Sequence, residues 1–509
     1  MRLHGWRSVC LVAFIAACGG GGAEPKYVNE FLIVDRTPAQ GSTNVHVGTE
    51  ITATFSRFLD PATVNDGNVI VTGTGGVSLG KTLSLTDENR TIVITLAAAP
   101  ALPADVTIVF TSGIQDVLGN PFTRAEWTFS MPEWWEPFGE TPANGSSSVD
   151  LDASGLPVVA WCASDGVHVS RWSAGGWTPV GQVLSLGGAG GCGTPSVAYS
   201  SLGDTLAVAW EETTSAGGSD RAMYVAVWNG TEWRNLSGAA LSASQAVATA
   251  TVPYGMSPTL ALDRTAVIYV AARVGLVVRA WQGTVGATSW TPLGGALNRN
   301  ASKQAGSPSA WMPHGVVVGW TEDPASLPNV GHPYARPLAS GDAYAASWES
   351  GTWSLVGLGK LNATGRIAYE IAVARSPSNL AAFADFDPAV ASSGALAVRT
   401  GTVSRGWTNA CAGTILDETS QWVDSIALAT AQGTGPTDPS GPPWIMYAQG
   451  GRLVVKSCET TWTSAGNLAE GSAVGPLFLD FARPTWTPTV AYVEAVTTPW
   501  RTVIKQPNR

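Results

Sequence analysis

The stretch from Pro157 to Gly181 contains the pattern that much of the chain repeats. It reads PVVAW over Pro157–Trp161, VHVSRW over Val167–Trp172 and GWTPVG over Gly176–Gly181. Apolar residues alternate with other residues in these segments, which is the pattern of short β-strands that bury one face. The chain is therefore predicted to be all-β, built from units of three or four strands. Weaker copies of the unit follow, ending at Trp233 and Gly294.

The unit recurs about every 40 to 60 residues, and a Trp closes each of its later strands. Small sheets repeated at this spacing are typical of the blades of a β-propeller. The copy over residues 368–409 is the weakest, so a ring of six blades with a separate C-terminal hairpin is the alternative. Seven innermost strands are expected, beginning near Val149, Ser196, Thr259, Ser309, Ala368, Ser425 and Leu477.

One further segment, Trp135–Gly139, has the same W-x-P-x-G form as Trp177–Gly181 and Trp290–Gly294. We interpret this form as the outermost strand of a blade. The last unit has no fourth strand of this form, and it offers three strands, at residues 477–481, 488–493 and 500–505. We therefore expect the strand at Trp135 to complete the last blade, which closes the ring and leaves no open sheet edge.

Residues 1–18 are interpreted as a targeting segment. Arg2 and Arg7 supply a positive charge ahead of a short apolar run, Val9–Ala17. This run is too short to be a permanent transmembrane helix, which needs about 20 residues. The sequence Ile15-Ala16-Ala17-Cys18 resembles the lipobox of bacterial lipoproteins, although that family usually has Leu at the position of Ile15.

The lipobox resemblance implies that Cys18 becomes the acylated first residue of the mature chain and anchors it to a membrane. Gly19, and not Asp, follows this cysteine, which in the family implies export to the outer membrane, facing the cell surface or the periplasm. Residues 19–30 contain a run of glycines and are expected to form a flexible tether. An ordinary secretory signal with an incidental cysteine is the alternative.

Residues 31–131 show alternating strands and regularly spaced turn residues, as expected for a β-sandwich of about 100 residues. The segment resembles the bacterial Ig-like domains of exported proteins, most specifically in its D-x-x-G-N-P turn at Asp116–Pro121. The resemblance implies a spacer or adhesive module, and the propeller is expected over residues 132–509. Other residues at that family's recurrent positions are Pro38, Gly41, Val45, Ile51, Phe55, Ser56, Asp60, Thr63 and Val64.

The composition excludes some classes of function. The chain has 58 Gly, 32 Pro and only 13% charged residues, which suits a protein rich in strands and turns. Its formal net charge of −10 would repel the phosphates of a nucleic acid, so no nucleic-acid partner is expected. Neither the histidines nor the aspartates of residues 31–131 have the spacing of metal ligands. No metal and no cofactor are therefore expected.

The cysteines outside the targeting segment form an even set of Cys162, Cys192, Cys411 and Cys458, which in an exported chain is compatible with two disulfides. Cys162 and Cys192 are expected in loops on one face of the ring and could approach within about 6 Å. Cys411 and Cys458 are expected on opposite faces. Either this second bridge is absent, or the predicted strands of the fifth blade are shifted by one. Free buried thiols are the alternative to both.

The longest predicted loops lie on one face of the ring, where loops on a rigid scaffold commonly bind ligands. Acids follow the second strand of several blades on this face, and tryptophans stand near the same strand ends. The acids could hold a cation or a basic partner, and the tryptophans could stack on sugars. Solvated loop charges and tryptophans packed between blades are the alternative. The candidate ligand-binding residues are Trp161, Asp165, Trp210, Glu211, Trp320, Glu322, Asp323, Asp385 and Asp387.

The sequence favours a non-catalytic binding or adhesion module whose ligand is a glycan or a protein. A glycosidase or lyase-type enzyme that cleaves a glycan with two of these acids is the alternative, and a purely structural envelope protein is a third reading. Ser347–Trp353 resembles the short turn between the third and fourth strands of sialidase-type propellers. That turn is structural in the family, so it supports the fold rather than catalysis. The scattered arginines form no assignable sialidase site, and no catalytic residue is predicted.

Overall fold

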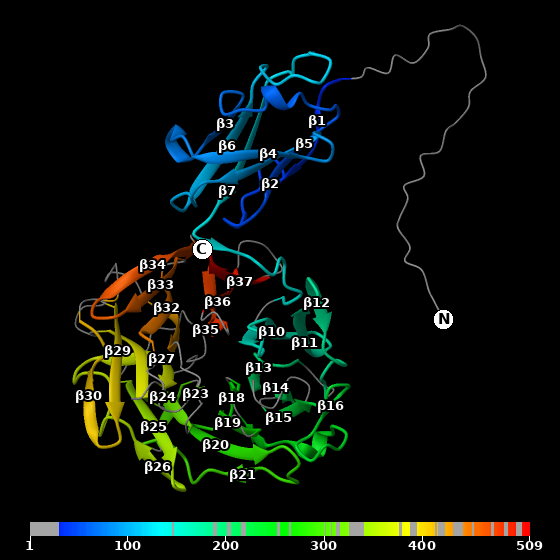
Figure 1. Cartoon of the computed structure of the whole chain (residues 1–509). Helices are drawn as coiled ribbons and strands as arrows, with labels where there is room; N and C mark the ends of the chain where they lie inside the picture. The colour runs from blue at the N-terminus through cyan, green and yellow to red at the C-terminus, as the bar shows by residue number, and fades with distance from the viewer. Residues whose placement is uncertain are drawn as a thin grey trace, which may run out of the picture. The chain divides into compact units, whose positions relative to one another are not determined.

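A computed structural model shows the chain as two compact units that divide after Ser130 (Figure 1). Strands dominate both units, and the described residues contain three short 3-10 helices and no α-helix. Among them, no helix has the length and apolar character needed to cross a membrane. The predicted targeting segment, Cys18 and nearly all of the tether lie outside the described part of the chain. The structure describes residues 30–508, apart from 145–146, 187–190, 201–204, 215–219, 252–254, 264–265, 301, 307, 312–315, 325–340, 376–378, 387–393, 413–414, 416–422, 431–440, 450–451, 470–472, 483–486 and 495–500.

The first unit is the predicted sandwich. One sheet has the order β1-β2-β5-β4 and the other the order β3-β6-β7. Alternate residues of each strand point into the core, where Phe55 and Phe110 from different sheets pack edge to face, 5.5 Å between ring centroids. Its elements are β1 (Ile33–Thr37), β2 (Ile51–Phe55), η1 (Pro61–Thr63), β3 (Val69–Thr72), η2 (Thr74–Gly76), β4 (Lys81–Thr86), β5 (Thr91–Leu96), β6 (Ala104–Phe110) and β7 (Ala125–Met131).

The D-x-x-G-N-P turn of this unit is organised by one buried carboxylate. Oδ1 of Asp116 accepts hydrogen bonds from the backbone N–H of Leu118 at 3.0 Å and of Asn120 at 2.8 Å. Oδ2 pairs with Nη1 of Arg57 at 2.9 Å. Burial raises the pKa of Asp116, but the hydrogen bonds, those from Asn120 first, outweigh burial and bring the pKa down to about 2. The turn motif is therefore a structural element of the sandwich.

The second unit consists of antiparallel sheets arranged as the blades of a propeller (Figure 1). The described residues form seven such sheets, which we number blade 1 to blade 7 in chain order. From the axis outwards, blades 1 to 4 are built from β9 (Ser147–Leu151), β10 (Pro157–Ala163), β11 (Gly166–Ser173) and β12 (Gly176–Pro179); β13 (Ser196–Ser200), β14 (Thr205–Thr213), β15 (Asp220–Trp228) and β16 (Trp233–Arg234); β18 (Thr259–Leu262), β19 (Val267–Val274), β20 (Val277–Thr284) and β21 (Thr291–Pro292); and β23 (Ser309–Trp311), β24 (Val317–Pro324), β25 (Asp342–Glu349) and β26 (Thr352–Leu355).

Blades 2 and 4 carry an additional strand each. Strand β17 (Ala248–Thr251) pairs with β15, and β22 (Lys303–Ala305) pairs with β24. A 3-10 turn, η3 (Ala243–Gln245), precedes β17. Blades 5 to 7 are built from β27 (Ile367–Arg375), β28 (Asn379–Phe386), β29 (Gly394–Thr402) and β30 (Arg405–Asn409); β31 (Val423–Thr430), β32 (Pro443–Gln449), β33 (Arg452–Cys458) and β34 (Trp462–Ala469); and β35 (Ala473–Ala482), β36 (Thr487–Glu494), β37 (Arg501–Pro507) and β8 (Trp134–Trp135).

The ring closes as the sequence predicts. Strand β8 is the outermost strand of blade 7, with Trp135 opposite Gln506 and Trp134 opposite Pro507. The C-terminal strands are thus part of a complete blade and not a separate hairpin. Each innermost strand contacts the next, and β35 contacts β9. Buried apolar clusters lie between neighbouring blades, so that burial of each sheet face depends on the adjacent sheet.

The W-x-P-x-G form has a defined structural role in fastening neighbouring blades. Nε1 of Trp233, in the outermost strand of blade 2, donates to the carbonyl oxygen of Val180 at 2.8 Å. Val180 is followed by Gly181, which has a φ of +69° and lies so close to Trp228 that a Cβ would come within 2.4 Å of its Cζ3. Glycine is needed there both for the left-handed backbone and for the close approach. Equivalent bonds join Trp177 to Phe138 and Trp353 to Leu293. Trp407 also donates to the preceding blade, to Gly359, which lies six residues after Trp353 and not three.

Candidate functional site

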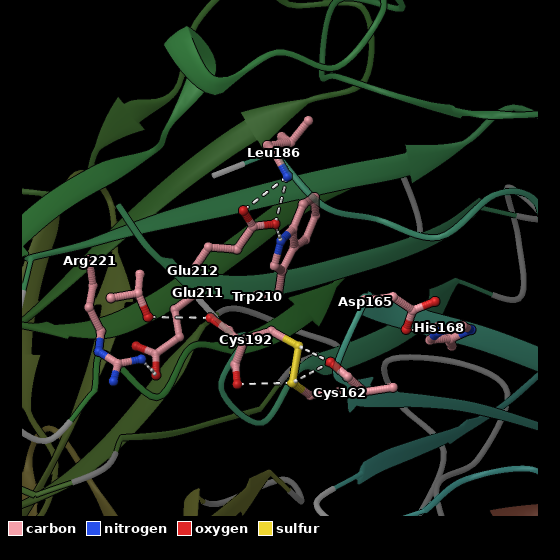
Figure 2. Close-up of a disulfide and its surroundings, with 12 residues drawn as sticks. Cys162, Asp165, His168, Leu186, Cys192, Trp210, Glu211, Glu212 and Arg221 are labelled. Atoms are coloured by element: carbon pink, nitrogen blue, oxygen red, sulfur yellow. Dashed lines mark hydrogen bonds and ion pairs between the residues drawn. A yellow bond between two sulfur atoms is a disulfide. The ribbon is translucent and has the colours of Figure 1, made fainter. Parts of the chain in front are cut away.

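The acids at the ends of the second strands of blades 2 and 4 are buried and have structural partners. In blade 2 the carboxylate of Glu212 accepts from Nε1 of Trp210 at 2.7 Å and from the backbone N–H of Leu186 at 2.8 Å (Figure 2). Leu186 belongs to the loop that enters blade 2. In blade 4 the carboxylate of Glu322 accepts from Nε1 of Trp320 at 2.9 Å and from the N–H of Asn300 at 3.0 Å. A W-x-E sequence therefore fixes the entering loop to its blade.

The side chain of Glu211 points away from that of Glu212, and its carboxylate also has hydrogen-bond partners within the protein (Figure 2). Its Oε1 pairs with Nη1 of Arg221 at 3.2 Å, and its Oε2 accepts from the backbone N–H of Met256. The carboxylate is only 6% exposed. Its surroundings are also tight, because a Cβ on Gly193 would lie 2.2 Å from Oε1. This carboxylate has no room for a ligand.

The remaining candidates do not form one surface. Asp385 is buried and accepts from Nε of Arg366 at 2.8 Å; burial raises its pKa, and the guanidinium acts in the opposite direction. Asp165 is 61% exposed and lies 2.7 Å from Nε2 of His168, whose ring stacks on Trp161. The hydrogen bond with His168 lowers the pKa of Asp165. The backbone of Asp323 pairs with Gln304, while Asp387 lies outside the described residues.

The structure therefore does not bring the predicted acids and tryptophans together on one exposed ring. Trp161, Trp210 and Trp320 are all buried within or between blades. Glu211, Glu322 and Asp385 are buried with them. The physical reason is that a loop entering a blade has unpaired backbone N–H groups, and a carboxylate at the adjacent strand end satisfies them.

Both cysteine pairs form disulfides. Cys162 and Cys192 join the exit of β10 to the loop before β13, with Cα atoms 5.7 Å apart, and this bridge links blades 1 and 2 (Figure 2). Cys411 and Cys458 form the second bridge, with Cα atoms 6.4 Å apart. The expectation that this second pair lies on opposite faces is wrong. The outermost strand, β30, is much shorter than its neighbour β29, so Cys411 has not crossed the blade.

A cavity of about 370 Å³ lies on the axis of the ring, lined by residues at or near the innermost strand of every blade. The start of β9 lies opposite the end of β10, since Ser147 pairs with Trp161. The cavity therefore opens on the face where the second strands end, which is the face predicted to carry the long loops. Its wall is rich in hydroxyl groups, supplied by Ser147, Ser148, Thr194, Ser196, Ser257, Thr259, Ser309, Ser425 and Thr502.

Some of these hydroxyls also accept hydrogen bonds from backbone N–H groups of the innermost strands. An innermost strand has no further strand on the side that faces the axis. The backbone N–H groups on that side therefore have no strand to pair with. Oγ of Ser148 accepts from the N–H of Val197 in the next blade at 2.9 Å, and Oγ of Ser196 accepts from Leu260 at 2.9 Å. A hydroxyl that accepts in this way still has its own hydrogen to donate. The cavity wall therefore presents O–H donors held in place by the blade junctions.

Glu370 is the one carboxylic acid among the described residues that line the cavity. It lies in β27, partly exposed, and burial raises its pKa to about 7. A second inner-ring carboxyl, Asp150, accepts from the N–H of Tyr199 at 2.7 Å. Burial and the neighbouring Asp480 raise the pKa of Asp150 to about 8. At pH 7 the carboxyl of Glu370 is thus divided about equally between its protonated and ionised forms.

Sequence reasoning missed the residues of this cavity. Ser or Thr recurs at the first position of the predicted innermost strands at Ser196, Thr259, Ser309 and Ser425. The recurrence was available as a signal, but a serine next to Gly and Pro residues has the appearance of a turn residue. No sequence feature distinguishes Glu370 from a solvated acid.

Residues 29–131 match the family of bacterial Ig-like domains. No curated protein sequence matches the chain. The solved structures similar to it include a mutant of the Aleuria aurantia lectin, with 11% identity, 67% of this chain and 100% of that chain covered, and a TM-score of 0.36.

Two enzymes are also among the similar structures. The polysaccharide lyase Uly1 has 11% identity, with 72% of this chain and 90% of that chain covered, and a TM-score of 0.44. The sialidase of Trypanosoma rangeli has 10% identity, with 74% of this chain and 59% of that chain covered, and a TM-score of 0.39. Because these TM-scores are low, no ligand or reaction is transferred from any of the three proteins to this chain.

Proposed function

We propose that this chain is an exported lipoprotein whose propeller binds a glycan or a protein, without catalysis, at the axial cavity. In this proposal Cys18 carries the lipid anchor at the outer membrane, and the Ig-like domain serves as a spacer. The lipobox sequence supports the anchor. The match of residues 29–131 to bacterial Ig-like domains supports the spacer.

The observation that carries the binding function is the hydroxyl-lined wall of the cavity. Its volume of about 370 Å³ lies within the range of small-molecule sites, which is about 300 to 1,000 Å³. O–H groups such as that of Thr259 can donate to the oxygens of a sugar or of a peptide backbone. A hydrolase that uses two carboxyl groups needs a second acid about 5 to 10 Å from the first. Among the described lining residues, Glu370 has no such partner.

A glycan-cleaving activity is the second candidate, and one observation favours it. The raised pKa of Glu370, about 7, is the value that suits a general acid or base at neutral pH. A lyase needs a base of this kind, and it does not need a second carboxyl in the role of nucleophile. Glu370 is therefore the residue whose replacement separates the two candidates.

The test uses the chain without residues 1–18 on a polysaccharide array, with released reducing ends and new double bonds measured in the same wells. Retention without release supports binding. Thr259→Val should then weaken retention severalfold, whereas Thr259→Ser, which keeps the hydroxyl, should not. Release that disappears in Glu370→Gln would replace the binding proposal with the enzymatic one.

The anchor is tested separately in cells. A labelled fatty acid should be incorporated into the wild-type chain, and the protein should fractionate with the outer membrane. Cys18→Ser should remove both the label and the membrane association. An unlabelled wild-type chain would contradict the lipoprotein proposal and leave the binding test unaffected.

A further inference from the structure

Trp290 lacks the indole hydrogen bond that fastens several of the blades. Trp177, Trp233, Trp353 and Trp407 each donate Nε1 to a carbonyl of the preceding blade. Trp290 stands at the corresponding position of blade 3, at the start of its W-x-P-x-G sequence. Among the hydrogen bonds of the described residues, none involves its indole N–H.

A different donor bonds to the carbonyl that this position would assign to Trp290. By position the carbonyl for Trp290 would be that of Leu236, which lies three residues after Trp233 as Val180 lies three residues after Trp177. The oxygen of Leu236 instead accepts from the backbone N–H of Gly286 at 2.7 Å. Gly286 lies in the connection between β20 and β21, which is longer than the corresponding turn of blade 1. The indole nitrogen of Trp290 is left with its hydrogen unused.

Trp290 lines a groove of about 390 Å³ at the junction of blades 2 and 3. The segment that carries η3 and leads into β17 forms the other wall. One side of the indole packs on blade 3, where a Cβ on Gly283 would lie 2.9 Å from its Cε3. The ring is partly buried, so it is held in place and still reaches the groove.

The groove is polar without being charged. The described lining residues include amides, hydroxyls and apolar groups, and no acid, Lys, Arg or His. The amide oxygens are already used, because Oδ1 of Asn235 accepts from the N–H of Ala239 at 2.8 Å and Oε1 of Gln245 accepts from that of Ser242 at 3.0 Å. The NH₂ groups of these amides and the N–H of Trp290 are left as donors. These donors favour a ligand that supplies acceptor oxygens, and the described lining has no charged side chain to pair with a charged ligand.

We propose that this groove is a second ligand site, which binds a neutral saccharide. A sugar ring has an apolar face that packs on an indole and hydroxyl oxygens that accept from Trp290 Nε1 and the amide groups. Charged ligands are disfavoured because the lining offers no counter-charge. The groove shares no described lining residue with the axial cavity, so this proposal stands independently of the proposed function.

The experiment uses the chain without residues 1–18, labelled with fluorotryptophan, and methyl glycosides of glucose, galactose, mannose and N-acetylglucosamine as probes. The fluorine NMR signal that is absent from Trp290→Phe is assigned to Trp290, and at least one glycoside should shift it. Trp290→Phe keeps the apolar face and loses the donor, so binding should weaken roughly tenfold. Ser289→Trp, at an exposed turn position that lines the groove, should block binding altogether.

The matched control is Trp353→Phe, which removes an N–H that is bonded to Leu293 at 2.7 Å. Trp353→Phe should lower the unfolding midpoint and leave glycoside binding unchanged. Trp290→Phe should instead weaken glycoside binding and leave the unfolding midpoint unchanged. Glu370→Gln should not affect binding at the groove. The proposal is overturned if no glycoside shifts the Trp290 signal up to millimolar concentration, or if Ser289→Trp binds as the wild type does.

Discussion

Cys411 and Cys458 form a disulfide at the place where other blades have a glycine packed against a tryptophan. The N–H of Ala410 donates to Val398 as that of Val180 donates to Val169, so Cys411 has the position of Gly181. Cys458 lies opposite Trp462 as Trp228 lies opposite Trp233, so Cys458 has the position of Trp228. Between blades 5 and 6 the disulfide thus stands where Gly181 and Trp228 make their contact between blades 1 and 2.

Removing this bridge should weaken the ring, and restoring the repeat's own contact should offset part of the loss. The double change Cys411→Ala with Cys458→Ala should lower the free energy of unfolding by about 2 to 4 kcal/mol. The double change Cys411→Gly with Cys458→Trp should be more stable than the alanine pair. Guanidinium unfolding of the propeller under non-reducing conditions measures both. Equal stability of the two double variants would contradict the equivalence of the positions.

Glu212 tests whether the W-x-E carboxylates are structural. Glu212→Gln keeps the shape but loses the charge that accepts from Leu186 and Trp210, which should cost about 1 to 3 kcal/mol of unfolding free energy. Asp165→Asn changes an acid that is 61% exposed and should have little effect. Thermal unfolding compares the two variants. A Glu212→Gln protein as stable as the wild type would contradict the structural role of this carboxylate.

Much of the architecture was predictable from local pattern. Alternating strands, the recurring tryptophans and the isolated W-x-P-x-G at Trp135 are features of single segments, and they led to the all-β units and the closure by β8. The position of Cys411 was not predictable, because it depends on how far β30 extends beside β29. The length of pairing is a tertiary property that the residues of β30 do not encode on their own.

The site was less predictable than the fold for a related reason. Glu212 and Glu322 have the sequence context of exposed acids at strand ends, and only the approach of the entering loop buries them. The hydroxyl of Ser196 is a candidate only once the innermost strands converge on the axis. Trp290 looks identical in sequence to Trp177, and the difference appears only in the structure, where the oxygen of Leu236 accepts from the N–H of Gly286 and not from the indole. Each of these outcomes depends on backbone groups distant in the chain.

Glu370 should make the stability of the propeller depend on pH. Its pKa is raised from 4.5 to about 7, so between these values the folded state holds a proton that the unfolded state releases. Stability from this group is therefore lost as pH rises from about 4.5 to 7. Glu370→Gln stays neutral and should be more stable than the wild type at pH 7.5 by about 1 to 3 kcal/mol, with no such gain at pH 4.

Unfolding midpoints of the two proteins across this range check the prediction. Asp150, whose pKa is raised to about 8, titrates in both proteins and does not affect their difference. A constant difference between wild type and Glu370→Gln from pH 4 to 7.5 would show that Glu370 has an ordinary pKa, and would remove the main argument for a general acid or base in the cavity.

Gly181 and Gly139 form a matched pair that separates backbone strain from steric contact. Both glycines end a W-x-P-x-G segment and both have a positive φ, +69° for Gly181 and +58° for Gly139. A Cβ on Gly181 would lie 2.4 Å from Trp228, whereas a Cβ on Gly139 would meet no atom within 4 Å. Gly139→Ala should therefore cost only the left-handed backbone penalty, about 1 to 2 kcal/mol. Gly181→Ala should cost about 2 to 5 kcal/mol, because overpacking adds to that penalty. Equal losses in chemical unfolding would mean that the ring tolerates movement of Trp228, and that the blade junction is held by the bond from Trp233 to Val180 rather than by close packing.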